Sequence, residues 1–87
     1  MDESEFLDEK QLLRRAQQAF ENANSSQSDV ARALGLNRSS VSRALRNAGL
    51  KHAAVQAKVV SVLEKVPVQR RPTYEGKEVE HLWAIDP

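Results

Sequence analysis

The polar and charged side chains best suited to binding a partner lie in one short segment, Gln27 to Arg46, which reads QSDVARALGLNRSSVSRALR. Its second half predicts a helix with one apolar and one polar face. The polar face carries guanidinium, hydroxyl and amide groups, from Arg38, Ser39, Ser40, Ser42, Arg43, Arg46 and Asn47. These groups donate hydrogen bonds and several are positively charged. The face therefore suits an anionic partner such as nucleic acid, and a solvated basic helix face is the simpler alternative.

The charge of the chain is distributed unevenly, although its formal net charge is only +1 at pH 7. Residues 1–26 carry six acids and three bases, and residues 53–87 carry five of each. The central residues 27–52 carry five bases and a single acid, Asp29. The basic charge thus coincides with the polar helix face, which is where contact with nucleic acid is expected.

No set of catalytic or metal-binding residues accompanies this segment. The chain has no cysteine, and His52 and His81 are far apart without acidic ligand spacing, so we expect no metal and no cofactor. Neither a nucleophile–histidine–acid arrangement nor a glycine-rich phosphate loop is present, so we expect no enzyme. Without a long apolar stretch or a secretory signal pattern, the chain is expected to be soluble and cytoplasmic, with no membrane contact.

The same segment predicts two short helices that meet across a tight turn. Ser26 can cap the first helix and Asn37 the second. Gly35 can take the left-handed conformation that ends the first helix, and Gly49 is expected just beyond the end of the second. The residues expected to face the core at this junction are small or aliphatic: Ala31, Leu36, Val41, Ala44 and Leu45.

At these restrictive positions the segment resembles the helix-turn-helix family of DNA-binding proteins. The resemblance is strongest over Gln27 to Arg46, with weaker flanking support from Leu12 to Leu63. One branch is the phage Cro and lambda-repressor type, in which a leading helix precedes the motif and further helices follow. The phrase ARALGLNRSSVSRALRNAGL is also similar to the factor-for-inversion-stimulation type, whose chains normally end soon after the final Gly-Leu. Because 37 residues follow Leu50 here, the phage or plasmid repressor type is favoured.

The resemblance implies a role for each polar position. In the family the second helix of the motif lies in the major groove, with its N-terminal residues at base edges, and an arginine there can donate two bonds to guanine. Arg32 points away from that helix and is expected to be a solvated charge. The resemblance assigns base reading to Arg38, Ser39, Ser40, Ser42 and Arg43. It assigns phosphate contact to Gln27, Asn37, Arg46, Asn47 and Lys51.

Three further elements must position the motif. Asp8 and Gln11 predict a capping box for a first helix, after an acidic, frayed segment at residues 1–6. Residues 53–66 predict a fourth helix ended by Pro67, although their many valines also allow a buried strand. Residues 68–74 and 79–85 predict a β-hairpin around Glu75-Gly76, with Pro72 confining the first strand to an edge.

The sequence therefore predicts a mainly α fold: a four-helix helix-turn-helix domain over residues 7–66, followed by a C-terminal β-hairpin or arm over residues 67–87. So short a chain has limited means of covering its apolar side chains alone. The apolar residues left without a place in the motif predict a homodimer interface, made of Val55, Val59, Val62, Val66, Leu82, Trp83 and Ile85. A two-fold dimer would match a palindromic operator.

These expectations favour a small homodimeric transcriptional repressor that binds a double-stranded DNA operator. The alternative is an antitoxin-like protein, whose C-terminal segment binds a partner protein and whose DNA binding is autoregulatory. Residues 67–87 remain open between a dimer arm, a partner-binding tail and a wing on which Arg70, Arg71 and Lys77 grip the DNA backbone. Acids close to these three bases favour an ordinary mixed surface over the wing.

Overall fold

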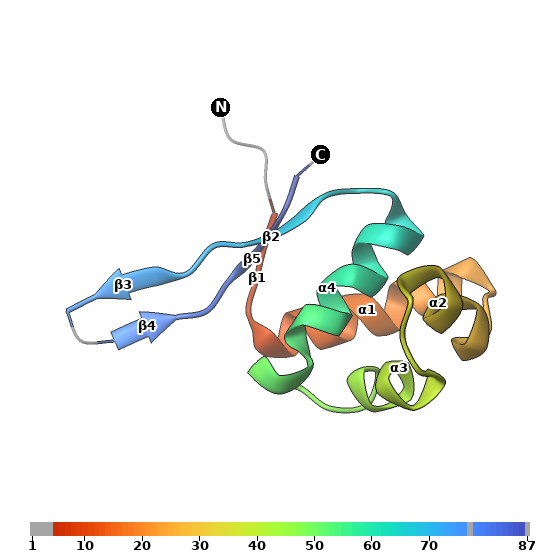
Figure 1. Ribbon diagram of the computed structural model, residues 1–87. Coiled ribbons are helices and arrows are strands. Elements are labelled where there is room, and N and C mark those ends of the chain that lie inside the picture. The colour runs from red at the N-terminus through yellow and green to blue at the C-terminus, as the bar shows by residue number, and fades with distance from the viewer. Residues whose placement is uncertain (1–4, 77, 87) are drawn as a thin grey trace.

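The computed structural model describes residues 5–76 and 78–86. A short strand, β1 (Glu5–Leu7), precedes four helices: α1 (Glu9–Ala23), α2 (Gln27–Leu34), α3 (Arg38–Ala44) and α4 (Leu50–Glu64). Four more strands follow: β2 (Val68–Arg70), β3 (Thr73–Glu75), β4 (Glu78–Glu80) and β5 (Trp83–Ile85). The predicted fold class, mainly α with a C-terminal hairpin, is confirmed. Figure 1 shows the helices as one body and β3 and β4 projecting away from it.

Helix α1 begins with the predicted capping box. The Asp8 carboxylate accepts a hydrogen bond from the Gln11 backbone N–H at 2.8 Å, and the Gln11 side-chain oxygen accepts one from the Asp8 N–H at 2.9 Å. Such a cap typically contributes about 1 kcal/mol. It fixes the helix register, which turns Leu12, Ala16 and Ala19 into the core.

Helix α4 confirms the predicted fourth helix over the competing strand, but it begins three residues earlier than expected, at Leu50. The role predicted for Gly49 was wrong. Helix α3 already ends at Ala44, and the backbone N–H of Asn47 bonds back to the Arg43 carbonyl at 3.1 Å. Gly49 instead occupies the N-cap position of α4 with φ 118°, a value that favours glycine.

The strands β1, β5 and β2 form an antiparallel sheet in that order. β1 joins it because Glu5 pairs with Ile85 and Phe6 with Ala84. The prediction of a frayed N-terminus was therefore wrong for Glu5 and Phe6, and residues 1–4 lie outside the described residues. Because β1 pairs with β5, the two ends of the described chain lie side by side (Figure 1).

The predicted hairpin is one long ribbon with a single register. Val68 lies opposite Ile85 in β2 and β5, and the same register places Thr73 opposite Glu80 in β3 and β4. Between the two paired regions the Arg71 N–H donates to the Leu82 carbonyl at 2.7 Å. Pro72 falls at this interruption, on the outer strand, as its missing N–H requires.

The core includes several residues that the sequence assigned to a dimer interface. Val59, Trp83 and Ile85 are 0%, 3% and 6% exposed, so for them the prediction was wrong. Val55 and Val66 pack partly buried against the same core, and Leu82 is half-buried. The reason is that α4 contacts both α1 and β2. Most of the residues predicted for the dimer interface are therefore covered within the chain itself. Val62 stays 42% exposed.

An ion-pair cluster ties the N-terminal strand to the helices. The Arg15 guanidinium donates two hydrogen bonds of 2.7 Å to the Glu64 carboxylate and one of 2.9 Å to Glu5. These bonds, first to Glu64 and then to Glu5, raise the pKa of Arg15 above its ordinary value. The cluster links α1, α4 and β1. Within residues 5–76 and 78–86, none of the helices has the length and apolar character of a membrane span.

Candidate nucleic-acid interface

Helices α2 and α3 meet across residues 35–37. Gly35 is left-handed with φ 69°, and its N–H donates to the Arg32 carbonyl at 3.3 Å. The Leu36 N–H donates to the Ala31 carbonyl at 2.8 Å. This pair of bonds is the Schellman arrangement, which turns the chain sharply at the end of a helix. Among the described residues no atom crowds a Cβ added at Gly35, so the glycine is needed for its backbone conformation.

The two predicted N-caps behave differently. The Ser26 hydroxyl accepts a hydrogen bond from the Asp29 N–H at 3.0 Å, which confirms it as the cap of α2. Asn37 is confirmed at the N-cap position of α3, but its side chain makes no capping hydrogen bond. Its exposed amide stands beside the first turn of α3, where the sequence placed a phosphate contact.

The inner side of α3 is fixed by burial. Val41 and Ala44 are fully buried and Leu45 is 7% exposed. On α2, Ala31 is also buried, with 3% exposed. This confirms the predicted helix crossing. The five predicted base-reading residues therefore lie on the remaining surface of one rigid helix: Arg38, Ser39 and Arg43 exposed, Ser40 and Ser42 half-buried.

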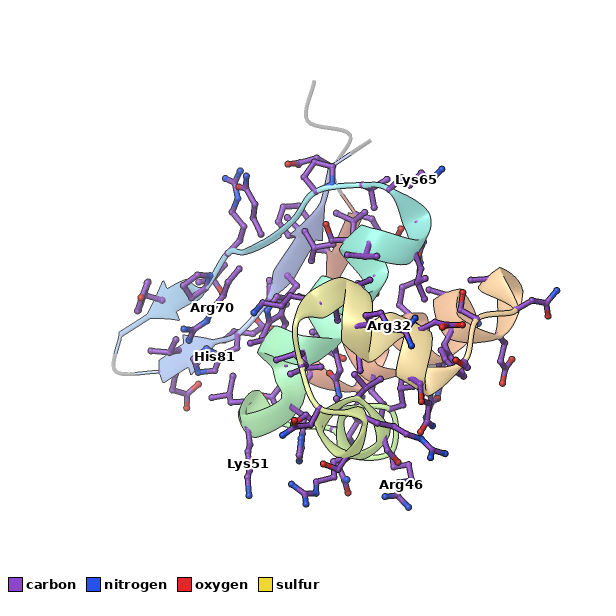
Figure 2. All side chains as sticks on the ribbon, turned by 45° about the vertical axis from the view of Figure 1, so that its right-hand side comes forward. Arg32, Arg46, Lys51, Lys65, Arg70 and His81 are labelled. Carbon is purple, nitrogen blue, oxygen red and sulfur yellow. The ribbon has the colours of Figure 1, made fainter. Side chains whose placement is uncertain are left out.

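The outer surface of α3 is basic and unpaired. Within the described part of the chain, Arg38 and Arg43 have no ion-pair partner, and α3 itself contains no acid. Arg32 differs, because it pairs with Asp29 at 3.8 Å along α2 and both side chains are largely solvated. It lies over α2 in Figure 2, whereas Arg46 and Lys51 point away from the helical body on the side of α3.

The predicted phosphate contacts divide into two groups. Arg46 and Gln27 line a common hollow of about 350 Å³ between the start of α2 and the end of α3, together with the acid Glu21. Lys51 is exposed on the first turn of α4. The Asn47 amide donates to the Arg43 carbonyl at 2.9 Å and Arg46 Nε donates to the Ser42 carbonyl at 3.3 Å, which orients both side chains along α3.

Two glutamines that the sequence reasoning missed anchor the C-terminal end of α3. Gln56 on α4 is fully buried, and its Nε2 donates to the Ala44 and Asn47 carbonyls at 2.8 and 2.7 Å. Gln17 Nε2 on α1 donates to the Leu45 carbonyl at 2.8 Å. The last carbonyls of a helix lack partners within the helix, and these amides supply them. One signal was available, because Gln56 interrupts an apolar stripe and a buried amide needs partners.

The remaining predicted residues lie on the ribbon and in α4. Arg70 Nη2 lies 2.6 Å from His81 Nδ1, and Arg71 donates to the Gln69 side chain at 3.2 Å. Lys77 lies outside the described residues. His52 on α4 and His81 belong to no group of three potential metal ligands within residues 5–76 and 78–86.

Comparison of the chain with protein-family models, curated proteins and solved structures finds no match. The function is therefore inferred from α2, α3 and the residues that flank them.

Proposed function

We propose that this protein binds duplex DNA sequence-specifically by placing α3 in the major groove, and that it acts as a homodimeric transcriptional repressor. The observation that carries the proposal is the contrast between the two sides of α3. Its inner side is locked into the core by Val41, Ala44 and Leu45. Its outer side presents unpaired arginines and short serines without an acid.

The dimensions and chemistry of α3 fit this role. An α-helix with its side chains is about 10–12 Å across, close to the width of about 12 Å of the B-DNA major groove. Ser39, Ser40 and Ser42 are short, so the helix backbone can approach the base edges. Arg38 and Arg43 can each donate a pair of hydrogen bonds to O6 and N7 of a guanine. Duplex DNA is thus a better match than a merely solvated helix face.

The flanking residues support the same orientation. Arg46 and Gln27 line a hollow at the C-terminal end of α3, and Lys51 is exposed on the first turn of α4. Contacts to phosphates fix the register of a protein on the duplex and leave sequence reading to the base contacts. Gln17 and Gln56 hold the C-terminal end of α3, which keeps the helix preorganised and lowers the entropic cost of binding.

The proposed mode of action is occlusion. One short recognition helix makes few base contacts, so two copies on adjacent half-sites raise both affinity and specificity. A dimer that covers a promoter blocks it without any further domain or cofactor. The antitoxin alternative has less support, because β5 contributes Trp83 and Ile85 to the core. A tail that folds only on a partner would not also complete the fold of the free chain.

Selection of bound duplexes from a random DNA pool tests the proposal. The expected result is an enriched motif that contains guanines in each half-site. The two half-sites should be inverted and centred one helical turn apart, about 10–10.5 base pairs, or a multiple of this. Recovery of no common sequence would contradict sequence-specific binding. Recovery of a single half-site would contradict the dimer and leave base reading by α3 in place.

A further inference from the structure

The long ribbon gathers most of its large apolar residues on one side, which also carries Arg70 and His81. Its single register pairs Val68 with Ile85 near the base and Tyr74 with Val79 near the tip. Side chains alternate between the two faces of a strand, and the positions of Trp83 and Val79 have the same parity. The inner half of this side covers the helices, with Trp83 and Ile85 buried. The outer half ends in Tyr74 and Val79, which are 71% and 44% exposed.

The projecting part of the ribbon, made of β3 and β4, is called the arm. Figure 1 shows β3 and β4 extending beyond the helices. Val79 and Glu80 share an open hollow with Glu9 and Lys10 at the start of α1. In the sequence, residues 73–80 include three acids, Glu75, Glu78 and Glu80, and one base, Lys77, so this segment is net negative. Its net negative charge is repelled by phosphates, which argues against a DNA-gripping wing. A surface that accepts the arm should be apolar and positively charged.

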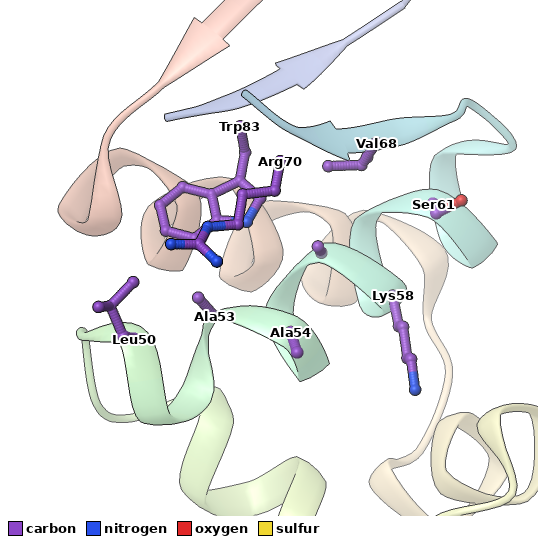
Figure 3. A pocket seen from close by; sticks show the side chains of 9 residues that line it. Leu50, Ala53, Ala54, Lys58, Ser61, Val68, Arg70 and Trp83 are labelled. Atoms are coloured by element: carbon purple, nitrogen blue, oxygen red, sulfur yellow. The ribbon is translucent and has the colours of Figure 1, made fainter. Parts of the chain in front are cut away.

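A groove with this character lies between α4 and the base of the ribbon. It has a volume of about 440 Å³ and a floor of small residues, Ala53, Ala54 and Ala57, with Leu50 at one end. Figure 3 shows Arg70 and Trp83 reaching from the strands toward Leu50 and Ala53, with Lys58 further along α4. Leu50 is 49% exposed. Lys58 and Arg70 are the charged lining residues among those described, and both are basic.

We propose that the arm of one copy of this chain lies in the groove of a second copy, and that the second arm returns the same contact. The apolar pair Tyr74 and Val79 meets the alanine floor and Leu50, and Glu78 and Glu80 meet Lys58 and Arg70. The ribbon directs each arm away from its own body, so a chain cannot fill its own groove. Arm and groove share the ribbon base, where Val68 and Arg70 line the groove. Two contiguous, mutually complementary patches form a closed two-fold dimer.

This inference deepens the proposed function, since it rests on the proposed homodimer and assigns its interface. The arm and the groove replace most of the dimer interface that the sequence predicted on α4. The dimer should weaken as salt rises, because Lys58 and Arg70 are exposed and charges in contact with solvent are screened by salt.

Sedimentation of the full-length protein without DNA tests the interface through charge reversal. The arm variant is Glu78→Lys with Glu80→Lys, the groove variant is Lys58→Glu, and Lys65→Glu at the far end of α4 is the matched control. Wild type and control should be dimers at micromolar concentration and low salt. Each of the other two variants should be a monomer. An equimolar mixture of the two should form dimers again, because each arm then faces a groove that it does not repel.

A variant that removes only apolar area completes the experiment. Tyr74→Ser changes a side chain exposed in the free chain, so circular dichroism should be unchanged while sedimentation shifts to the monomer. The proposal is overturned by a monomeric wild type at low salt, by dimeric arm and groove variants, or by a mixture that stays monomeric. A dimer that selects no DNA motif would refute the proposed function and leave the interface standing. A monomer that selects a single half-site would refute the interface and leave base reading by α3 standing.

Discussion

Replacing Gln56 by leucine isolates the role of the amide that anchors α3. Leucine preserves most of the volume, but the Ala44 and Asn47 carbonyls lose their donor. A buried carbonyl left without a donor costs about 1–3 kcal/mol, and this applies to Ala44. The Asn47 carbonyl is only partly buried and can bond to water instead. Removal of Gln56 Oε1, which has no partner among the described residues, returns about 1 kcal/mol. We expect a net loss of about 1 kcal/mol, within a range of about 0–2 kcal/mol.

The assay is thermal and urea unfolding followed by circular dichroism. In a domain of this size a loss of 1 kcal/mol lowers Tm by about 4–8 °C, so Gln56→Leu should lower Tm by about this much. The matched control is Gln18→Leu at an exposed position of α1, expected to change stability by less than about 0.5 kcal/mol. Gln17→Leu, which breaks one partly buried bond, should fall between them. Equal Tm values for Gln56→Leu and the control would refute the anchoring argument.

Three further substitutions test the fold. Trp83→Ala should cost about 3–5 kcal/mol in urea unfolding, and a cost below that of an exposed residue would show that β5 is not part of the core. Gly35→Ala should cost about 1–2 kcal/mol through left-handed strain, and Gly35→Asn should cost less; equal stability of the wild type and Gly35→Ala would contradict the Schellman turn. Arg15→Met should lose about 1 kcal/mol at low salt. That loss should shrink at high salt, and a salt-independent difference would contradict the ion pairs with Glu64 and Glu5.

The helix-turn-helix segment could be predicted because its determinants are local. The Asp8 capping box, the Ser26 cap and the left-handed Gly35 each depend on residues within five positions of one another. The apolar spacing of α3 fixed which side faces the core. These features therefore follow from the sequence without knowledge of the rest of the chain.

The sheet and the anchors of α3 could not be predicted in the same way. Phe6 pairs with Ala84, a contact that no local pattern encodes. A glycine at position 49 suits either the end of one helix or the start of the next. Helix α3 ends early, at Ala44, and Gln56 of α4 donates a hydrogen bond to the Asn47 carbonyl just beyond it. Trp83 was assigned to a dimer because the strand that carries it had no predicted place in the core. Non-local packing determined each of these outcomes.

The most direct test of base reading by α3 compares affinity for the selected duplex with affinity for random duplex at one salt concentration. Arg43→Ala and Arg38→Ala should each lose roughly 1–3 kcal/mol on the selected duplex, about 5- to 150-fold. They should lose far less on random duplex. Arg32→Ala, which removes a solvated charge on α2, should change neither affinity appreciably. Equal losses of Arg43→Ala and Arg38→Ala on both duplexes, or no loss on either, would contradict base reading by α3.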